Sequence, residues 1–302
     1  MGSEMCIRDS RYIDSRFRDM HIKLLITIAD DPSHNAIVAG GRNIHDGFLF
    51  KTKPDMSKYP ELVQYGKDED FVHWNDFEMK ITSKDMAFVT AAHLLKFWNR
   101  DTMTQTLEDY YAPGTNVSER GPHQFRHFIS LPYSDNHALE DVYVSLIDNA
   151  RKSIRISSPY LRPTSRIMDA LKRAADRKLD IIIQTRVSLE GDTQAWLYEE
   201  VNKESINALY DKVKIYEWKQ NSILHSKFIL VDGEIAFVGS VNLSRLSFVQ
   251  DVENGFLIKD KTFVARMEAI FNTYISKSVQ LTESQDRKVF PSILIKILQD
   301  QF

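Results

Sequence analysis

Two stretches of the chain place a histidine two residues before a lysine, ahead of an apolar run. The clearer stretch, LHSKFILVDGEIAFVGSVNLS at 224–244, contains His225 and Lys227. In an extended strand, residues i and i+2 point to the same face, so this imidazole and this ammonium group project together. An imidazole can attack phosphorus or transfer a proton, and an ammonium group can hold a phosphate. The pair therefore predicts chemistry on a phosphate ester.

The same stretch ends in groups that can donate hydrogen bonds to a phosphate. Its last apolar run is followed by GSVN at 239–242. Ser240 offers a hydroxyl, Asn242 offers an amide, and the glycine permits close backbone approach. Asp232 lies between the two apolar runs and precedes a glycine, which is a strong hairpin signal. We assign Ser240 and Asn242 to phosphate binding, and Asp232 to the motif that carries the histidine and lysine.

A weaker copy of the pattern lies near the start of the chain, in MHIKLLITIADDPSHNAIVAGGRN at 20–43. His21 and Lys23 open it, and Gly41 and Asn43 belong to the GGRN that closes it. The order of histidine, lysine, apolar run, turn, apolar run and glycine is the same in both copies. We therefore assign His21 and Lys23 to catalysis, and Gly41 and Asn43 to phosphate binding.

An acidic residue opens a further strand-like run after each copy. Asp76 precedes FEMKI and Glu253 precedes NGFLI. Two copies with two acids indicate an internal duplication and a pseudo-twofold axis. Acid–base chemistry with two histidines needs them in different protonation states. A carboxylate bonded to the far ring nitrogen fixes each tautomer, which is the role we expect for Asp76 and Glu253.

The first copy departs from the second in its turn. The position that matches Asp232 is Ile28, and Asp30 and Asp31 follow inside a longer connection. The histidine and the first glycine of GGRN are 19 positions apart in the first copy, against 14 positions to the matching glycine in the second. We expect activity to survive this change.

The second half of the chain alternates strand and helix patterns. Apolar and β-branched runs predict strands, and apolar residues at helical spacing predict helices. The expected strands are 152–161, 179–185, 213–218, 226–231, 234–239 and 255–258, and the expected helices are 165–178, behind a serine cap, 194–209 and 262–275. This order predicts a mixed α/β sheet with helices packed on it.

The first half carries a fainter version of the same order. A hairpin is expected at 21–27 and 36–39, a strand at 77–81 and a helix at 84–98. Residues 103–132 contain two Pro-Gly or Gly-Pro pairs, which indicate a loop-rich connection between lobes. The final segment, 291–302, is expected to be a short amphipathic helix packed at an edge of the core.

Composition limits the class of protein. The 302 residues carry a formal net charge of −3. A general nucleic-acid binder has an overall basic excess, so we expect no nucleic-acid partner. No apolar run approaches the length of a membrane span. Cys6 is the single cysteine, which excludes an intrachain disulfide. Cysteine and histidine do not follow metal-site spacing, so we expect neither a metal nor another cofactor.

The first ten residues look foreign to the fold. Residues 5–10 read MCIRDS, which matches the translation of a transposon sequencing adapter. We expect 1–10 to be a non-native leader and exclude it from fold reasoning. The rest divides into a first lobe at 11–130, which we expect to be truncated at its N-terminus, and a second lobe at 131–302.

The paired motif resembles the phospholipase D superfamily, whose members carry two HxK(x)4D(x)6G(G/S)xN motifs. Two flanking segments, GGRNIHDGF at 40–48 and SSPYLRPT at 157–164, are similar to its bacterial cardiolipin synthase-like branch. The resemblance extends from about residue 11 to about residue 275. It implies two α/β/α lobes with mixed sheets, related by a pseudo-twofold axis, with the active site between them.

The resemblance also implies a reaction: phosphatidyl transfer or phospholipid hydrolysis through a phosphohistidine. His21 would be the nucleophile, and His225 the general acid and later the general base. Asp76 and Glu253 would orient the two histidines. The groups expected to hold the phosphate are Lys23, Lys227, Asn43, Ser240 and Asn242. The implied partners are a membrane phospholipid and an alcohol or water acceptor, with peripheral contact at the bacterial cell membrane.

Two other classes of function stay open from the sequence. One is a phosphodiesterase on nucleic acid, as in the nuclease branch of the superfamily. The acidic net charge and the presence of both motifs in one chain weigh against it, because small nucleases of this type often carry one motif and dimerise. The other is a lipid-binding homologue with impaired catalysis, which Ile28 and the longer first turn would suggest.

Overall fold

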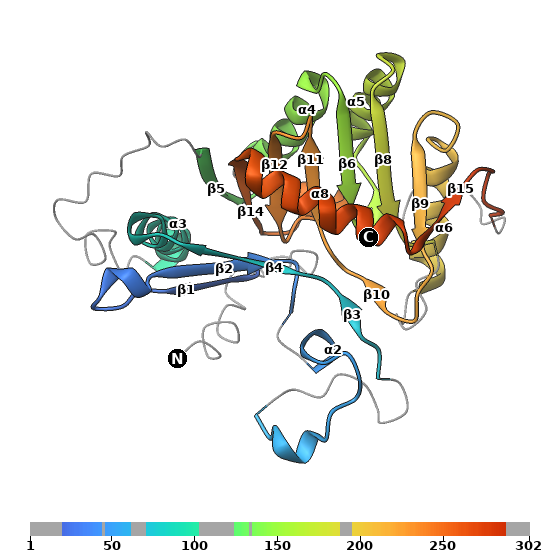
Figure 1. Ribbon diagram of the computed structural model, residues 1–302. Coiled ribbons are helices and arrows are strands. Elements are labelled where there is room, and N and C mark those ends of the chain that lie inside the picture. The colour runs from blue at the N-terminus through green and yellow to red at the C-terminus, as the bar shows by residue number, and fades with distance from the viewer. Residues whose placement is uncertain are drawn as a thin grey trace.

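The computed structural model describes residues 20–43, 46–61, 71–102, 124–132, 135–187 and 195–287. A small sheet lies beside a large one, and the two carry the two histidine motifs (Figure 1). The expected mixed α/β fold is confirmed. Among the described helices, none is both long and apolar enough to cross a membrane.

The large sheet is mixed and has the strand order β15-β9-β8-β6-β11-β12-β14-β5. Its strands β6, β8 and β9 are mutually parallel, and the other neighbours pair antiparallel. Its members are β5 (Gln124–Ser130), β6 (Ser153–Ser157), β8 (Asp180–Thr185), β9 (Lys214–Trp218), β11 (Phe228–Val231), β12 (Ile235–Gly239), β14 (Glu253–Lys259) and β15 (Ser278–Leu281). The central strands are almost continuously apolar because helices cover both faces of the sheet.

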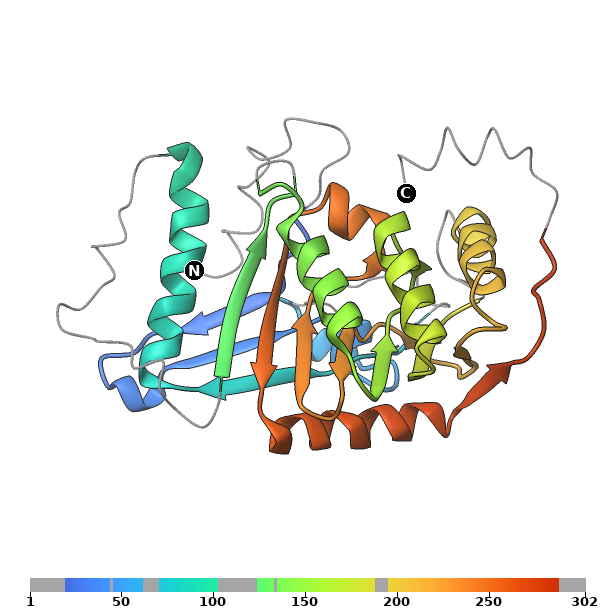
Figure 2. The same ribbon diagram turned by 90° about the horizontal axis from the view of Figure 1, so that it is seen from above.

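Helices α4 (Ala138–Asn149), α5 (Ser165–Asp176) and α6 (Ala195–Asn207) lie on one face of this sheet, and α8 (Lys261–Ile275) lies on the other (Figure 2). Helix α5 buries Ile167, Leu171 and Ala174 along one side. Its cap is Thr164, whose hydroxyl accepts the N–H of Ile167, so the predicted serine cap is wrong by one residue. The core beneath α4–α6 is a single apolar cluster.

The small sheet has three antiparallel strands in the order β1 (Leu24–Thr27), β2 (Ala36–Gly40) and β4 (Glu78–Thr82). Its inner face, including Ile37 and Met79, shares a core with α3 (Lys84–Thr102), with α8 and with the near face of the large sheet. Its outer face is open, and Leu25 there is 58% exposed. Only one apolar layer therefore supports β1.

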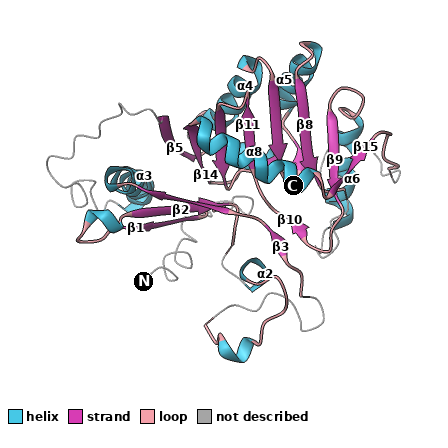
Figure 3. Ribbon diagram, in the orientation of Figure 1, coloured by secondary structure: helices cyan, strands magenta, loops and turns pink. Residues whose placement is uncertain are grey.

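Short elements connect the sheets around the histidine motifs (Figure 3). They are α2 (Asp46–Leu49), β3 (Trp74–Asn75), β7 (Leu161–Arg162), β10 (Ile223–Leu224), β13 (Leu243–Ser244) and α7 (Arg245–Val249), with the 3-10 turns η2 (Pro32–His34) and η3 (Met56–Lys58). Strands β10 and β3 form a two-stranded parallel sheet, as do β13 and β7.

Several elements differ from the sequence expectations. Helix α4 and strand β15 were not predicted, and β5 lies inside the region 103–132 that we expected to be loop-rich. Strand β5 pairs along its whole length with β14 of the large sheet. The expected leader at 1–10 and the helix at 291–302 lie outside the described residues. The division into lobes at 11–130 and 131–302 stays a proposal.

Candidate active site

Each histidine segment lies beside the acid segment of the other sequence repeat. Strand β10, just before His225, runs parallel to β3, just before Asp76. The backbone N–H of His225 donates to the carbonyl of Asn75 at 3.0 Å. This pairing places His225 and Asp76 at the same end of a short parallel ladder.

The other histidine is placed in the same way. Met20 forms a parallel bridge with Val252, and the N–H of His21 donates to the carbonyl of Val252 at 2.9 Å. The N–H of Lys23 also donates to the side-chain oxygen of Asn254 at 3.1 Å. His21 therefore lies next to Glu253, as His225 lies next to Asp76.

The resulting histidine–carboxylate pairs are crossed between the repeats. Nδ1 of His21 lies 3.0 Å from each oxygen of Glu253, and Nδ1 of His225 lies 2.8 Å from Oδ2 of Asp76. Both carboxylates are buried. A ring nitrogen bonded to a carboxylate carries its proton, which leaves Nε2 as the reactive atom of each neutral ring. The sequence predicted this role for the two acids, and the structure adds which acid serves which histidine.

The two lysines are held by the histidine backbones. Nζ of Lys23 donates to the carbonyl of His21 at 3.0 Å, and Nζ of Lys227 donates to the carbonyl of His225 at 2.5 Å. An ammonium group has three donors, so each lysine keeps capacity for a substrate. Burial lowers the pKa of Lys23 to about 8 and that of Lys227 to about 7, against the opposing attraction of nearby carboxylates such as Glu253 and Asp76.

The same burial acts on the histidines and on one acid. It lowers the pKa of His21, although Glu253 opposes the shift. It lowers the pKa of His225 further, with the charges of Lys227, Lys23, His21 and Arg186 adding to the effect. Burial raises the pKa of Asp76 to about 6, and the positive charge of Lys227 opposes this shift by lowering the pKa. These mutual effects show that both histidine motifs share one electrostatic site.

The two acids are held by different groups. Ser240 donates its hydroxyl to Glu253, and that hydroxyl also contacts the backbone of Asn254. The residue that matches Ser240 in the first copy is Gly41, where a Cβ atom would lie 2.6 Å from Oδ2 of Asp76. No side chain fits there, and Asp76 instead accepts the N–H of Phe77 at 2.8 Å. Gly41 thus lets Asp76 approach closely.

Arg42 supplies the remaining support for Asp76. Its Nη2 donates to the backbone carbonyl of Asp76 at 2.8 Å. Its positive charge also lowers the pKa of that carboxyl, against the larger effect of burial. The matching residue of the second copy is the buried Val241, which has no charge. Arg42 lies within the GGRN segment, but its contact with Asp76 could not be predicted from the sequence.

The predicted phosphate ligands fall into two environments. Asn242 is buried, and its side-chain oxygen has no hydrogen-bond partner within the described structure. Asn43, its counterpart, is exposed. Ser240 is buried behind Glu253. Phosphate binding by these residues and by Gly41 stays a proposal, and Ser240 has a defined partner that the sequence could not indicate.

Asp232 lies away from the histidines, at the tip of the β11–β12 hairpin. Its carboxylate accepts the backbone N–H groups of Arg151, Lys152 and Ser153 at 2.7–2.9 Å. Both it and Gly233 have positive φ, as a two-residue hairpin turn requires. The structure therefore places this residue, grouped with the catalytic set from its motif, where it supports the fold.

The first copy uses other groups at the equivalent turn. Ile28 is 42% exposed and follows β1. The longer connection closes through η2, whose cap Asp31 accepts the N–H of Ser33 at 2.9 Å. Asn35 is buried and accepts the N–H of Ala29 at 2.9 Å. These local bonds replace the long-range contacts that Asp232 makes in the second copy.

Aromatic rings surround His225, which the sequence did not predict. The rings of Phe48 and Trp74 meet its imidazole edge-on, at centroid distances of 4.8 and 5.0 Å. Phe48 and Trp74 stack on each other at 5.1 Å. Phe48 is the last residue of GGRNIHDGF, a segment that the sequence analysis included. Its contact with His225 could not be predicted from the sequence. These rings contribute to the burial that lowers the pKa of His225.

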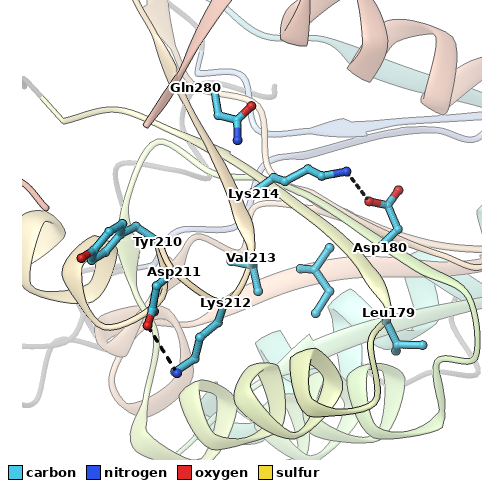
Figure 4. Close-up of a pocket in the computed structure, with 9 residues that line it drawn as sticks. Leu179, Asp180, Tyr210, Asp211, Lys212, Val213, Lys214 and Gln280 are labelled. Carbon is cyan, nitrogen blue, oxygen red and sulfur yellow. Dashed lines mark hydrogen bonds and ion pairs between the residues drawn. The ribbon is translucent and has the colours of Figure 1, made fainter. Parts of the chain in front are cut away.

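Neither the described pocket nor a metal cluster competes with this site. A pocket of about 260 Å³ opens at the start of β8 and β9, where Tyr210 and Gln280 line it (Figure 4). Its charged groups are paired: Lys214 with Asp180 at 2.9 Å and Lys212 with its neighbour Asp211. Within the described ranges, no three His, Cys, Asp or Glu residues are grouped as a metal site would require.

Comparisons with known proteins agree with the motif. The family described as "Cardiolipin synthase, PLD-like domain" matches residues 143–275. Cardiolipin synthases from Listeria innocua serovar 6a and Staphylococcus aureus strain Mu50 are each 27% identical, over 245 and 251 residues. The matches cover 80% and 82% of this chain and 46% of each relative. The chain therefore spans about half the length of the curated relatives it matches.

A solved structure shows the same fold over most of the chain. Phosphatidylserine synthase from Haemophilus influenzae Rd KW20 aligns with a TM-score of 0.67 and 15% sequence identity. The alignment covers 94% of this chain and 68% of that protein. At this level of identity the likeness is one of fold alone. It supports the arrangement of the two sheets around the crossed histidine pairs.

Proposed function

We propose that this chain is an enzyme of the phospholipase D superfamily, similar to its cardiolipin synthase branch, and that it transfers or hydrolyses phosphatidyl groups of membrane phospholipids. One observation carries the proposal: His21 and His225 each hold Nδ1 against a carboxylate of the other repeat, at 3.0 and 2.8 Å. Two such histidines, with two buried lysines, can perform a double displacement at phosphorus.

The first step is attack by the histidine that is more open to a substrate. The side chain of His21 is 25% exposed, against 7% for His225. The lone pair of Nε2 of His21 attacks phosphorus and forms an N–P bond. The phosphorus–oxygen bond to the leaving alcohol breaks. For this step His225 must be an imidazolium, a form that the Asp76 carboxylate and the negative charge of the bound phosphate favour. The leaving oxygen then takes the proton from Nε2 of His225, the general acid, which becomes neutral.

The second step reverses these roles with a new alcohol or water. The acceptor hydroxyl gives its proton to His225, its oxygen attacks phosphorus, and the N–P bond breaks. The lone pair returns to Nε2 of His21. Glu253 and Asp76 stabilise the imidazolium forms that appear along the way, as a buried carboxylate does for a catalytic histidine. Water as the acceptor gives hydrolysis, and an alcohol headgroup gives transfer.

The lysines and amides would stabilise the charge that develops on the phosphoryl oxygens. Lys23 and Lys227 each have spare donors, and Lys227 is buried whereas Lys23 is partly buried. Asn242 adds a buried side-chain amide at the end of β12. Arg186, just after β8, adds a positive charge, which also lowers the pKa of His225. We propose a location at the surface of the bacterial cell membrane, where such lipids are found.

Incubation of the chain with phosphatidylglycerol vesicles tests the proposal. We expect diphosphatidylglycerol and glycerol if a second lipid is the acceptor, or phosphatidic acid if water is. His21→Ala is the inactive control, and Asp211→Asn, on the opposite side of the large sheet, is a matched control that should keep wild-type activity. Rapid quenching and mass spectrometry should find a phosphatidyl adduct on His21. Lipid turnover in His21→Ala equal to that of the wild type would refute the assignment.

A further inference from the structure

A small projection of the first lobe extends away from both sheets beside the candidate active site. It consists of residues 46–61, with α2 and η3 as its only regular elements. Figure 1 shows it below β3 and β10. Contacts within the projection hold its shape: the rings of Phe50 and Tyr59 meet at 5.0 Å, and Asp55 caps η3. We call residues 46–61 the basal projection.

The basal projection exposes apolar and basic side chains together. Leu49 is 48% exposed and Tyr59 is 40% exposed, and they are two of the few large apolar side chains exposed in the described structure. Lys51, Lys53 and Lys58 are also exposed, against the exposed carboxylates of Asp55 and Glu61. Residues 46–61 contain three lysines and three acidic residues, and only the burial of Asp46 leaves the exposed surface with one positive charge in excess. Lys58 lies 3.7 Å from Asp55.

This combination is typical of a surface that meets a lipid bilayer. Tyrosine and leucine side chains enter the boundary between headgroups and acyl chains. Lysines extend their ammonium groups back toward the phosphates of the headgroups. A protein–protein contact of standard size would require a far larger apolar area than two side chains supply.

The basal projection is joined directly to the candidate active site. Phe48 precedes Leu49, and its ring lies 4.8 Å from the ring of His225. The carbonyl of Phe50 contacts Nδ1 of His73 at 3.1 Å, and His73 begins the segment that leads through β3 to Asp76. A bilayer contacted by Leu49 would therefore lie one residue away from a side chain that packs on the candidate general acid.

We propose that the basal projection docks this protein on anionic phospholipid bilayers, with Leu49 and Tyr59 inserted at the headgroup boundary and the lysines on lipid phosphates. The proposal rests on the proposed function, since a phosphatidyl phosphorus lies at headgroup depth. Docking at this point would let a lipid phosphate reach His21 and His225 without leaving the membrane.

Vesicle flotation of the full chain tests the docking surface without any need for catalysis. The vesicles are pure phosphatidylcholine, or phosphatidylcholine with phosphatidylglycerol. We expect binding to the anionic vesicles, and about a tenfold weaker partition for the double variant Leu49→Ser/Tyr59→Ser, because two apolar side chains no longer enter the boundary. Lys51→Glu should weaken binding to the anionic vesicles by several-fold and leave the weak binding to phosphatidylcholine unchanged.

Two exposed residues elsewhere provide matched controls. Leu25 on β1 is 58% exposed and Val279 on β15 is 51% exposed, and neither belongs to the basal projection. Leu25→Ser and Val279→Ser should keep wild-type partition. The proposal is overturned if these controls lose as much binding as the double variant, or if the double variant binds as the wild type does. A change in molecular mass of the double variant would instead assign the surface to self-association and also overturn the proposal.

Activity on a soluble lipid separates this proposal from the proposed function. The double variant should turn over monomeric dihexanoyl-phosphatidylglycerol at the wild-type rate, but should lose activity on vesicles in proportion to its partition. Loss of both activities would place Leu49 and Tyr59 in the catalytic machinery and overturn the docking role. If no variant and no wild-type protein acts on any lipid, the proposed function fails, while the flotation result still decides the docking surface.

Discussion

The two copies of the histidine motif lead into strands that are buried to different extents. Leu25 in β1 is 58% exposed, whereas Ile229, at the matching position of β11, is fully buried. Strand β11 has a partner on each side, β6 and β12, but among the described strands β1 pairs only with β2. The same difference continues into the site, where the His21 side chain is 25% exposed and that of His225 is 7% exposed. The two copies thus share the same histidine and lysine groups, although the packing around these groups differs.

We propose that this inequality gives the two histidines different roles. A nucleophile must meet the substrate, so exposure suits His21. A general acid and base works best when its proton cannot exchange with bulk water, so burial beneath Phe48 and Trp74 suits His225. Four experiments probe this division, and we order them by the size of the expected effect.

Replacing each histidine in turn by alanine should have the largest effect on activity, and the two variants should differ. His21→Ala should lower kcat/KM by about 10⁵-fold on any substrate, because it removes the covalent intermediate. His225→Ala should lower it by about 10³-fold on a natural lipid. With a nitrophenyl leaving group, which needs no protonation, His225→Ala should still release a burst of nitrophenol. A burst from His21→Ala, with none from His225→Ala, would reverse the assigned roles.

Removing one carboxylate should weaken only its own histidine. Glu253→Gln and Asp76→Asn should each lower kcat by roughly a hundredfold. The supports of these acids differ, so Ser240→Ala should act through Glu253 and Arg42→Met through Asp76. Double-mutant cycles measure this: Ser240→Ala should add little to Glu253→Gln, and Arg42→Met little to Asp76→Asn. Full additivity within either pair would contradict the assignment.

The two turns should differ in their contribution to stability. Asp232→Asn should lower the free energy of unfolding by about 2 kcal/mol, because it weakens three charge-assisted bonds to backbone N–H groups. Asp31→Asn in the first turn should cost less than about 0.5 kcal/mol, since asparagine caps nearly as well as aspartate. Urea unfolding at neutral pH compares the two variants. Equal losses of unfolding free energy would contradict the prediction, because they would show that the two turns contribute equally to stability.

The lysines should produce different alkaline limits in kcat/KM. A lysine whose folded-state pKa is depressed holds its positive charge below that pKa and loses it as pH rises. Lys227, with a pKa of about 7, should therefore release its proton before Lys23, with a pKa of about 8. The wild-type kcat/KM should fall above pH 7, and Lys227→Arg should move that fall toward pH 8. Lys23→Arg is the matched control and should leave the first fall in place.

Most of the fold and the members of the site could be predicted from the sequence. The alternation at 213–218 and the Asp232-Gly233 turn encode β9 and the β11–β12 hairpin locally, through side-chain period and positive φ. The His-x-Lys spacing, found twice, predicted the four candidate side chains, although residues 21–23 and 225–227 lie just outside the strands in which the sequence analysis had expected them to point to one face. Asp76 and Glu253 were found from the repeat, without knowledge of their contacts.

What could not be predicted depends on contacts between distant segments. No local pattern distinguishes Gly41, which lies against Asp76, from a glycine that only ends a strand. Phe48 and Trp74 become neighbours of His225 only through the pairing of β3 with β10. Strand β5 was missed because turn residues surround it and its partner, β14, is more than a hundred residues away in sequence.

The crossed histidine–carboxylate pairs can form only late in folding. The bond between His225 and Asp76 joins residues 149 positions apart, and that between His21 and Glu253 joins residues 232 apart. Contacts of such long range are closed after local ones, because the intervening chain must first be ordered. Each histidine gains its carboxylate only when the two distant segments that carry the pair have come together. A partly folded molecule would thus expose lysines and imidazoles without the arrangement that makes them reactive.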